Sequence, residues 1–444
     1  MISIYKRSTT SAIAFIFFSA FTLMQPSASA ADLSLCRIKA SDRENVSLGF
    51  PLRDGRLAMV KNPKILVIPF QLKERPNYLL TELDKEDYKN AERDLNLFSG
   101  GKANVEFIYA PTLVTEYTKD TLVELKANQQ KGNQDKDESV STWGFVRKLV
   151  AASDAKVDFS DIDAVILEGS SVSWASFIGE AMMFRTDQPN GYFRPITTDE
   201  GTINNAILLD RHYSRFTIAH EVLHLFGLTD LYGTSTGPGK LSIMAGDSPA
   251  ILSYEKWVLG WLPDSEVQCF PDLATTTITE IKLDTRKDSQ VVVLPGKSDS
   301  HIIIETSKIE KNKYLALYTL NNETRPPIVS FADNQGMSRE GLSINGYQAI
   351  GKIFDLPDFS LIVSELNDTA LTLKLLPKQL RDTPTNAALI EEAARNLKSA
   401  ETASVAIPKK PIKDKTVTIT CLKGKAQKKV TAVKPICPKG YKKK

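Results

Sequence analysis

Residues 218–232 read Ile218-Ala219-His220-Glu221-Val222-Leu223-His224-Leu225-Phe226-Gly227-Leu228-Thr229-Asp230-Leu231-Tyr232. The apolar residues recur at helical spacing, and Gly227 is a suitable end for the helix because glycine accepts the left-handed conformation found there. Residues four apart share one face of a helix, so His220 and His224 point the same way and can hold one metal ion. Glu221 lies beside them, within reach of a water molecule on that ion.

This histidine pair predicts a catalytic zinc site. Imidazole nitrogen suits zinc, and catalytic zinc takes three protein ligands and keeps one position open. Once the chain has turned at Gly227, Asp230 can supply the third ligand, at the spacing that metzincins use. Glu255 is the competing third ligand. The competing interpretations are a turn residue or cap for Asp230 and a surface charge for Glu255.

Four other residues near the motif have weaker assignments. Met244, within Ser242-Ile243-Met244-Ala245-Gly246, is expected to pack beneath the metal site as a core residue. Tyr232 and Tyr254 are candidates to stabilise an oxyanion, although core packing is the favoured interpretation of both. His212 is expected to lie outside the metal ligands.

The motif and its surroundings resemble the immune inhibitor A-type metallopeptidases, secreted bacterial enzymes of the metzincin-like group. The resemblance covers roughly residues 49–265 and is dense from 218 to 262, where Leu259-Gly260-Trp261 ends a second motif. It implies that His220, His224 and Asp230 bind zinc, that Glu221 is the catalytic base, and that Met244 belongs to a methionine turn. It also implies structural Ca²⁺. Thr229 stands where the family has proline.

The predicted function is therefore a secreted zinc-dependent endopeptidase that acts on proteins or peptides. Glu221 would serve as the general base for a water molecule on the zinc ion. The alternative is a catalytically inactive peptidase-fold protein that acts as an extracellular binding or adhesion module. The β-rich region after residue 275 and the basic tail motivate this alternative.

The first thirty residues predict export. Lys6 and Arg7 precede an apolar run, and Ala28-Ser29-Ala30 matches the small-x-small pattern that signal peptidase accepts. No later segment is apolar for long enough to cross a membrane. Four cysteines fit an exported protein. A disulfide between Cys421 and Cys437 could close a small hairpin and would leave Cys36 and Cys269 to pair with each other. Four cysteines allow three connectivities, however, and the sequence does not choose between them.

The predicted fold class is α+β. A metzincin-like zinc peptidase domain (31–270) would precede a β-rich, sandwich-like module (271–378), a helical spacer with a Lys/Pro-rich linker (379–415) and a basic cysteine-bearing tail (416–444). Strands are expected at 64–70, 103–109 and 163–167, with an edge strand at 206–209 and several strands between 278 and 375. Helices are expected at 77–97 and 139–153, and irregular structure at 111–135.

Charge is distributed unevenly along the chain. Residues 401–444 contain thirteen lysines and two acidic residues and carry +11, and the predicted signal carries +2. Since the whole chain carries +3, the remaining residues 31–400 carry −10. The tail is expected either to contact an anionic cell-wall polymer or lipid head groups, or simply to be solvated. Nucleic acid is not an expected partner, because the basic charge is confined to one extracellular segment.

Overall fold

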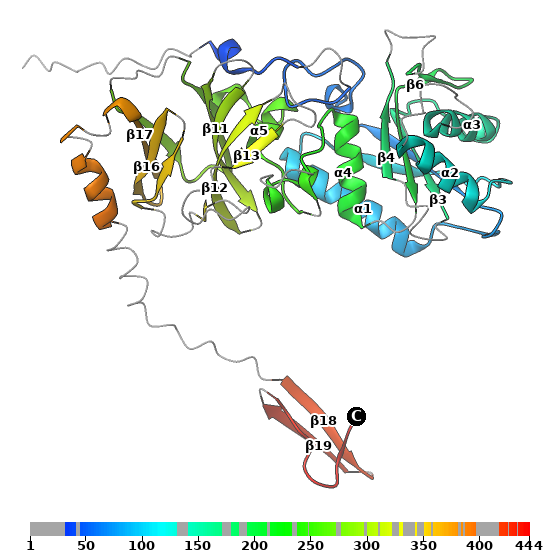
Figure 1. Cartoon of the computed structure of the whole chain (residues 1–444). Coiled ribbons are helices and arrows are strands. Elements are labelled where there is room, and N and C mark those ends of the chain that lie inside the picture. Colours follow the sequence, from blue (N-terminus) through cyan, green and yellow to red (C-terminus); the bar gives the residue numbers. More distant parts are fainter. Residues whose placement is uncertain are drawn as a thin grey trace, which may run out of the picture.

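The structure is a computed structural model of the 444-residue chain (Figure 1). It describes residues 32–40, 45–130, 141–170, 179–185, 193–210, 214–232, 238–246, 248–271, 277–296, 300–309, 311–321, 328–331, 342–343, 350–356, 358–380, 383–384, 387–396, 417–424, 426–432 and 434–444. The predicted signal 1–30, His212 and most of the predicted linker lie outside these residues. No helix in the described part of the chain is long and apolar enough to span a membrane.

A mostly parallel sheet forms the first part of the fold. Its strand order is β2-β1-β3-β7-β4. The strands are β1 (Lys64–Phe70), β2 (Glu106–Tyr109), β3 (Ala164–Gly169), β4 (Gly179–Met183) and β7 (Asn205–Asp210). Only β4 runs antiparallel to its neighbour, and it forms one edge. The prediction of an edge strand at 206–209 is wrong, because β4 covers that side of β7. The sequence of β4 contains no β-branched residue, so its strand character was not recognisable.

Helices cover both faces of this sheet (Figure 1). The helices are α1 (Glu82–Ser99), α2 (Lys119–Gln130), α3 (Thr142–Asp154) and α4 (Arg215–Phe226). Val67 and Ile207 face one core with α1 and α4, whereas Leu66 and Leu208 face a second core with α2 and α3. Both faces are buried, which explains why β1 and β3 read as continuous apolar runs.

Two of these helices illustrate what the sequence did and did not reveal. Helix α1 begins with a capping box between Thr81 and Asp84, and it is tied to α4 by an ion pair of 3.3 Å between Asp94 and Arg215. Helix α2 corrects the prediction of irregular structure at 111–135. Only Leu122 and Leu125 of its described side chains are buried, so its sequence looks almost uniformly polar.

The second part consists of two sheets and contains the strands predicted between 278 and 375. The larger sheet has the order β13-β12-β11-β10-β8, with β14 paired to β12, and the smaller has the order β15-β16-β17-β9. The strands are β8 (Val267–Cys269), β9 (Thr279–Asp284), β10 (Ser289–Pro295), β11 (Ser300–Ile309), β12 (Asn312–Asn321), β13 (Ile328–Phe331), β14 (Leu342–Ser343), β15 (Ile353–Asp355), β16 (Phe359–Leu366) and β17 (Ala370–Pro377).

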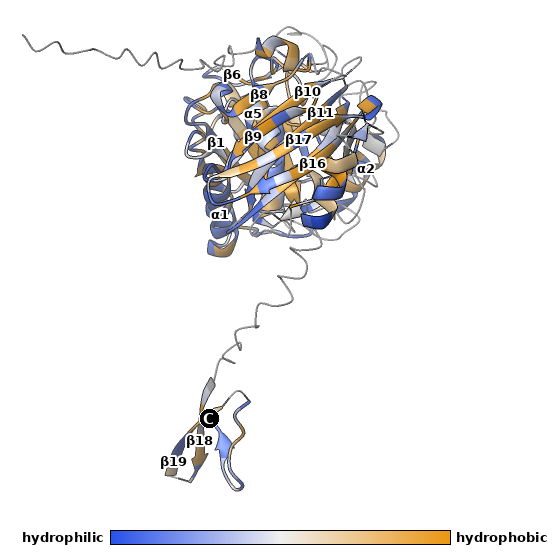
Figure 2. Ribbon diagram, turned by 90° about the vertical axis from the view of Figure 1, so that its left-hand side faces the viewer, coloured by the Kyte–Doolittle hydropathy of each residue, from blue (hydrophilic) through white to orange (hydrophobic). Residues whose placement is uncertain are grey.

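One hydrophobic cluster runs through both parts of the fold. It includes Val222 of α4, Trp257 of helix α5 (Ser253–Val258), Val292 of β10 and Leu373 of β17. Figure 2 shows the apolar character of the strands β10, β11, β16 and β17. Residues 387–396, within the predicted spacer, are helical, and Ala393 packs on the outer side of β16 and β17. The described chain is thus a mixed α/β structure, and the predicted domain boundaries remain a prediction.

Short elements connect these parts. They are the 3-10 helices η1 (Leu33–Cys36), η2 (Leu57–Met59), η5 (Gly239–Leu241), η6 (Ile243–Ala245), η7 (Asp264–Glu266) and η9 (Lys378–Leu380), and the strand pair β5 (Ile196–Thr197) and β6 (Thr202–Ile203).

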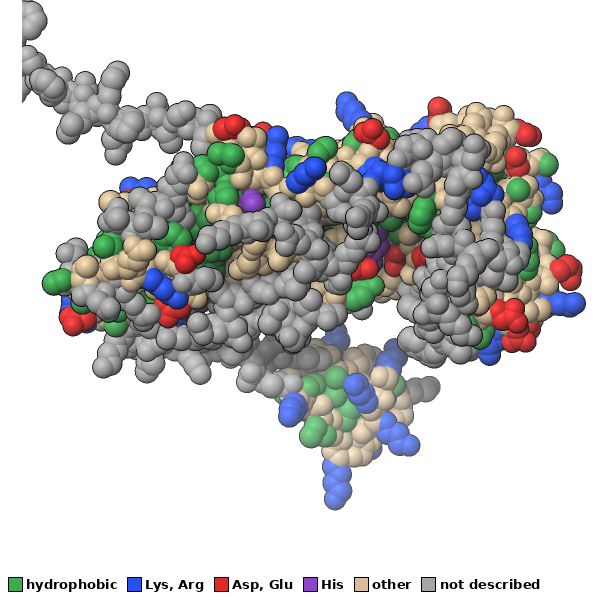
Figure 3. Space-filling view, turned by 45° about the horizontal axis from the view of Figure 1, so that its top comes forward, with side chains coloured by type: hydrophobic (Ala, Val, Ile, Leu, Met, Phe, Trp, Pro, Cys, Tyr) green, Lys and Arg blue, Asp and Glu red, His purple; other side chains and the backbone are tan. Residues whose placement is uncertain are grey.

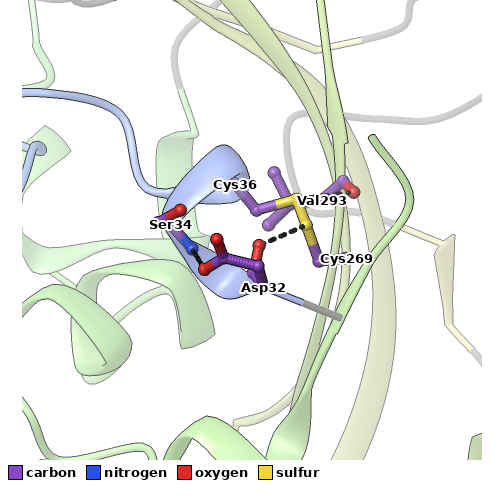
Figure 4. Close-up of a disulfide and its surroundings, with 5 residues drawn as sticks. All are labelled: Asp32, Ser34, Cys36, Cys269 and Val293. Carbon is purple, nitrogen blue, oxygen red and sulfur yellow. Dashed lines mark hydrogen bonds between the residues drawn. A yellow bond between two sulfur atoms is a disulfide. The ribbon is translucent and has the colours of Figure 1, made fainter. Parts of the chain in front are cut away.

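Two disulfides select one of the three connectivities that the sequence left open. Cys36 of η1 is bonded to Cys269 of β8, and the Cys269 sulfur lies 4.0 Å from the Asp32 carbonyl oxygen (Figure 4). Cys421 belongs to a separate sheet of order β19-β18-β20, and it is bonded to Cys437, which lies between β19 and β20 in the chain. The strands of this sheet are β18 (Val417–Lys423), β19 (Ala426–Ala432) and β20 (Lys442–Lys443). Residues 417–444 are called the basic module below.

Candidate metal site

Three side chains converge at the end of α4. The Nε2 atoms of His220 and His224 each lie 3.1 Å from the same Asp230 oxygen, Oδ1. The candidate ligand atoms of these residues all lie within 4.8 Å of one another. In the part of the chain that the structure describes, this is the one group of three such residues arranged for a metal, and Glu255 does not belong to it.

The local chain path explains how Asp230 reaches the histidines. Helix α4 ends at Gly227, whose φ of 117° lies in the left-handed region that favours glycine. The Leu228 N–H donates back to the Leu223 carbonyl at 3.1 Å, which turns the chain. The Leu231 N–H then donates to the Met244 carbonyl at 2.8 Å and fixes the residue that follows Asp230.

The remaining ring nitrogens have partners that orient both imidazoles. His220 Nδ1 lies 2.9 Å from the Ile243 carbonyl oxygen, and His224 Nδ1 lies 2.8 Å from the Leu228 carbonyl oxygen. A carbonyl oxygen only accepts, so each Nδ1 carries the proton in the neutral ring. Each Nε2 then keeps a lone pair that can bind a metal ion held between the two rings and Asp230. Two imidazole nitrogens and one carboxylate oxygen form a donor set that suits zinc.

The electrostatics of Asp230 and His224 are those of a cation site. Burial raises the pKa of Asp230, but the hydrogen bonds that the Nε2–H groups of His220 and His224 donate when those rings are protonated outweigh this effect and hold the pKa well below its usual range. Burial lowers the pKa of His224, but its hydrogen bond to Asp230 and the Glu221 charge raise that pKa to about 9. The carboxylates therefore stabilise positive charge at this position, whether a proton or a metal ion supplies it.

Glu221 is buried on the same helix, beside the ligand group. Burial raises the pKa of Glu221, and the neighbouring His224 and His220 partly offset this effect. Its carboxylate accepts a hydrogen bond from the Ala181 N–H of the edge strand β4. A carboxylate with a raised pKa in a fixed orientation is suited to taking up and returning a proton.

Sequence reasoning missed Glu180, the neighbour of Ala181 on β4. Burial and the nearby Glu221 charge raise its pKa to about 7, although hydrogen bonds to Thr142 and Trp143 oppose the shift. Its Oε2 atom is buried and accepts no hydrogen bond from the described residues. No sequence signal indicated Glu180, because the strand that carries it was not recognised.

The two candidate tyrosines occupy different environments. Tyr232 is 53% exposed, so the prediction of core packing is wrong for it, and its ring stacks on the His220 ring with 6.0 Å between centroids. Burial and the Asp230 charge raise the pKa of Tyr232, so its hydroxyl stays protonated. Tyr254 is buried in the core against Phe50 and Trp257, in agreement with the packing interpretation.

Met244 is fully buried in the short turn η6, which supports both ligand-bearing segments. The carbonyl of Ile243 accepts from His220, and the carbonyl of Met244 accepts from Leu231, next to Asp230. The turn itself is fixed by Ser242, whose hydroxyl oxygen accepts the Met244 N–H at 3.0 Å. The methionine contributes packing, and the backbone around it contributes the hydrogen bonds.

Hydrogen bonds to Glu255 hold this turn in place. The Ser242 hydroxyl lies 3.0 and 2.8 Å from the two Glu255 carboxylate oxygens, and the Leu252 N–H donates to Glu255 at 2.8 Å. Glu305 of β11 in turn accepts the Ser253 and Tyr254 N–H groups at the start of α5, at 3.0 and 2.9 Å. The β-rich part thus anchors the helix that carries Glu255.

The raised pKa of Glu255 predicts that the stability of the folded chain depends on pH. Burial raises its pKa from 4.5 to about 8 in the folded chain, and the nearby Glu305 charge adds to the shift. Because the folded state holds the proton more tightly, the stability that the neutral carboxyl contributes is complete below pH 4.5 and is lost as pH rises through 8.

We therefore compare the wild type with Glu255→Gln, which cannot titrate at this position. Between pH 4.5 and 8, the free energy of unfolding of the wild type is expected to fall by a few kcal/mol more than that of the variant. Urea unfolding at several pH values measures this difference. Parallel pH curves for the two proteins would show that the buried carboxyl does not titrate in this range.

The comparisons with known proteins are sparse. No family model matches the sequence, and no curated protein matches it. Sixteen chains of solved structures match. One is the crystal structure of metalloproteinase-II from Bacteroides fragilis, with 17% sequence identity and a TM-score of 0.24. The match covers 51% of this chain and 57% of that chain, so it spans little more than half of either protein.

Proposed function

We propose that this chain is an exported zinc-dependent endopeptidase of the metzincin-like, immune inhibitor A type. His220, His224 and Asp230 would hold the zinc ion, and Glu221 would be the catalytic base. The observation that carries the proposal is the convergence of three ligand atoms within 4.8 Å beside a buried carboxylate on the same helix. Structural Ca²⁺ and the domain boundaries remain predictions from the sequence.

The proposed reaction is hydrolysis of a peptide bond. A zinc ion bound by this donor set would polarise a water molecule and the peptide carbonyl. Glu221 takes the proton of the attacking water as its oxygen bonds to the carbonyl carbon, and it returns a proton to the nitrogen as the C–N bond breaks. The Ala181 N–H holds the Glu221 carboxylate in place for both transfers. Tyr232, half-exposed beside His220, is the proposed donor to the developing oxyanion.

Export is the second component of the proposal. All four cysteines are in disulfides, and disulfides persist in oxidising compartments. The predicted signal at 1–30 and the two disulfides therefore favour the same location, outside the cytoplasm.

The alternative, an inactive binding module on a peptidase fold, is less well supported. The β-rich region after residue 275 and the basic tail motivate it. The β-rich region, however, shares one core with α4, and Glu305 anchors the helix behind the methionine turn. Support of this kind is expected where a metal site must be held rigidly.

Cleavage of unfolded substrates tests the proposal. We expect the purified 31–444 chain, supplied with zinc, to cut casein and a mixed peptide library at internal bonds, as read by mass spectrometry of the products. Release of single terminal residues only would exclude an endopeptidase. A zinc-loaded chain that cuts neither substrate would move the binding-module alternative to first place.

Paired variants identify the third ligand. We expect Asp230→Ala to weaken zinc binding by about 100-fold or more, because it removes both a ligand and a charge. Glu255→Gln is expected to weaken it by about tenfold at most, since Glu255 acts through Ser242 and the turn. Competition with a chromogenic chelator measures both affinities. The reverse order would assign Glu255, and not Asp230, to the metal.

A further inference from the structure

The basic module carries an unusual charge pattern. Its 28 residues contain nine lysines and no Asp, Glu, Arg or His. The eight lysines that the structure describes are all exposed, namely Lys423, Lys428, Lys429, Lys434, Lys439, Lys442, Lys443 and Lys444. A solvated surface ordinarily mixes both signs of charge, so a segment with only one sign produces a strong local field.

The strand register places these lysines on both faces of the sheet. Lys428 and Lys443 are both paired with Cys421, so the three side chains share one face. Lys429 is paired with Thr420 and Lys442 with Leu422. Each is the sequence neighbour of one of the first two lysines, and because successive side chains of a strand alternate, both lie on the opposite face. Strands β19 and β20 are the two outer strands of the sheet. Figure 3 shows Lys side chains projecting from several sides of this module.

The disulfide holds these like charges together. Cys421 is fully buried and bonded to Cys437, sixteen residues away. Such a small sheet buries little apolar surface, so a disulfide is a typical means of keeping it folded. Repulsion between the lysines destabilises the compact state. A few lysines on outer strands would suffice to prevent edge-to-edge aggregation, and this role does not require the complete absence of acidic residues.

We propose that the basic module binds a flexible linear polyanion with a phosphodiester backbone and no bases. Lysine is a compact point charge that binds phosphate without the planar geometry that arginine imposes. Because the lysines occupy both faces and both outer strands, a flexible chain can wrap around the module and contact all of them. The module needs no shaped pocket for a ligand of this kind, only a high density of positive charge.

Two other anionic partners fit the module less well. A bilayer is flat and would contact one face at a time, leaving the lysines of the other face unused. Ile436, 82% exposed, is the one large apolar side chain of the described module available for insertion into a bilayer. Single-stranded nucleic acid is held largely by stacking of bases on aromatic rings, and Tyr441 is the only aromatic residue of the module.

The rest of the chain restricts polyanion binding to this module. Residues 31–400 carry −10, so a polyanion is repelled from the part that holds the candidate metal site. Binding through the module would keep the enzyme at an anionic polymer without occupying that site. This inference does not depend on the proposed peptidase activity.

Equilibrium binding of the 31–444 chain to labelled poly(glycerol phosphate) tests the inference. We expect binding at 20 mM NaCl whose log K falls linearly and steeply with log salt concentration, as counterion release requires. The competing probes are phosphatidylglycerol vesicles, oligo(dT) and polygalacturonate, a carboxylate polymer. Each is expected to bind more weakly than the phosphate polymer at equal charge concentration.

Matched double variants test the wrapping geometry. We expect Lys428→Ser/Lys443→Ser on one face and Lys429→Ser/Lys442→Ser on the other to weaken binding by about 10- to 30-fold each, at roughly 1 kcal/mol per lysine. Lys61→Ser/Lys89→Ser, which removes two exposed lysines of the main body, is the control and should change nothing. Thiol titration under denaturing conditions verifies that the Cys421–Cys437 bond is present in each variant.

Three outcomes would overturn the inference. The first is no binding of poly(glycerol phosphate) at low salt. The second is tighter binding of vesicles, oligo(dT) or polygalacturonate, which would assign the module to a membrane, a nucleic acid or a carboxylate polymer. The third is a loss of binding from one face only, because a wrapped chain must contact both.

Discussion

Replacement of Glu221 by Gln is expected to lower kcat for peptide hydrolysis by about 10³- to 10⁴-fold while one zinc ion per chain is retained. Gln has the same shape, fits the same buried position and still accepts the Ala181 N–H, but it cannot take a proton from water. Glu221 contributes no atom to the group formed by His220, His224 and Asp230, so zinc binding should survive.

Glu180→Gln is the matched control for this variant. Glu180 also has a raised pKa and a buried carboxylate oxygen, but it lies on β4 and not among the ligands. We expect its kcat to stay within about tenfold of the wild type, since removal of a charge near Glu221 shifts only the pKa of the base. If Glu221→Gln cut casein as fast as Glu180→Gln, Glu221 would not be the base.

Removal of the metal is expected to abolish cleavage and to lower Tm. A chelator takes away the ion on which the polarisation of water depends, and zinc added back should restore both properties. Zinc at 100 times its Kd stabilises the folded chain by about 2.7 kcal/mol, which corresponds to about 3 °C for a chain of this size. Activity assays and thermal scans on the same samples measure the two effects together.

Variants of two buried histidines separate the effect of losing the metal from the effect of losing a buried side chain. His224→Ala removes a ligand and should mimic chelation, whereas His301→Ala alters a histidine of β11 outside the ligand group and should keep its zinc. Both variants are expected to lose stability through the cavities that they create. Cleavage that resists chelation, or that survives in His224→Ala, would rule out the metal mechanism.

The candidate site could be predicted from the sequence because its geometry is local. His220, Glu221 and His224 lie on one helix, and Asp230 follows after a single turn at Gly227. Helical spacing alone places the two histidines on one face, and the turn needs only a glycine. Strand β1 and helix α3 were predictable for a similar reason, since runs of β-branched residues and helical spacing are visible within each segment.

The support of the site could not be predicted, because it joins residues that are distant in the sequence. The sequence predicts either a zinc ligand or a surface charge at Glu255, but Glu255 is fully buried, so the surface charge is wrong, and its contact with Ser242 arises from how α5 packs. The contact between Glu305 and the Ser253 N–H crosses 52 positions. Strand β4, which orients Glu221, has no alternating apolar pattern and becomes a strand only by pairing with β7.

X-ray absorption at the zinc edge, combined with elemental analysis of the purified 31–444 chain, is the most direct measurement of the metal site. We expect one zinc per chain, with two imidazole nitrogens at about 2.0–2.1 Å, oxygen ligands at about 2.0–2.2 Å and no sulfur. Sulfur is not expected because all four cysteines are in disulfides. A chain purified without zinc that fails to bind it when supplied, or a zinc shell without imidazole, would contradict the assignment of His220, His224 and Asp230.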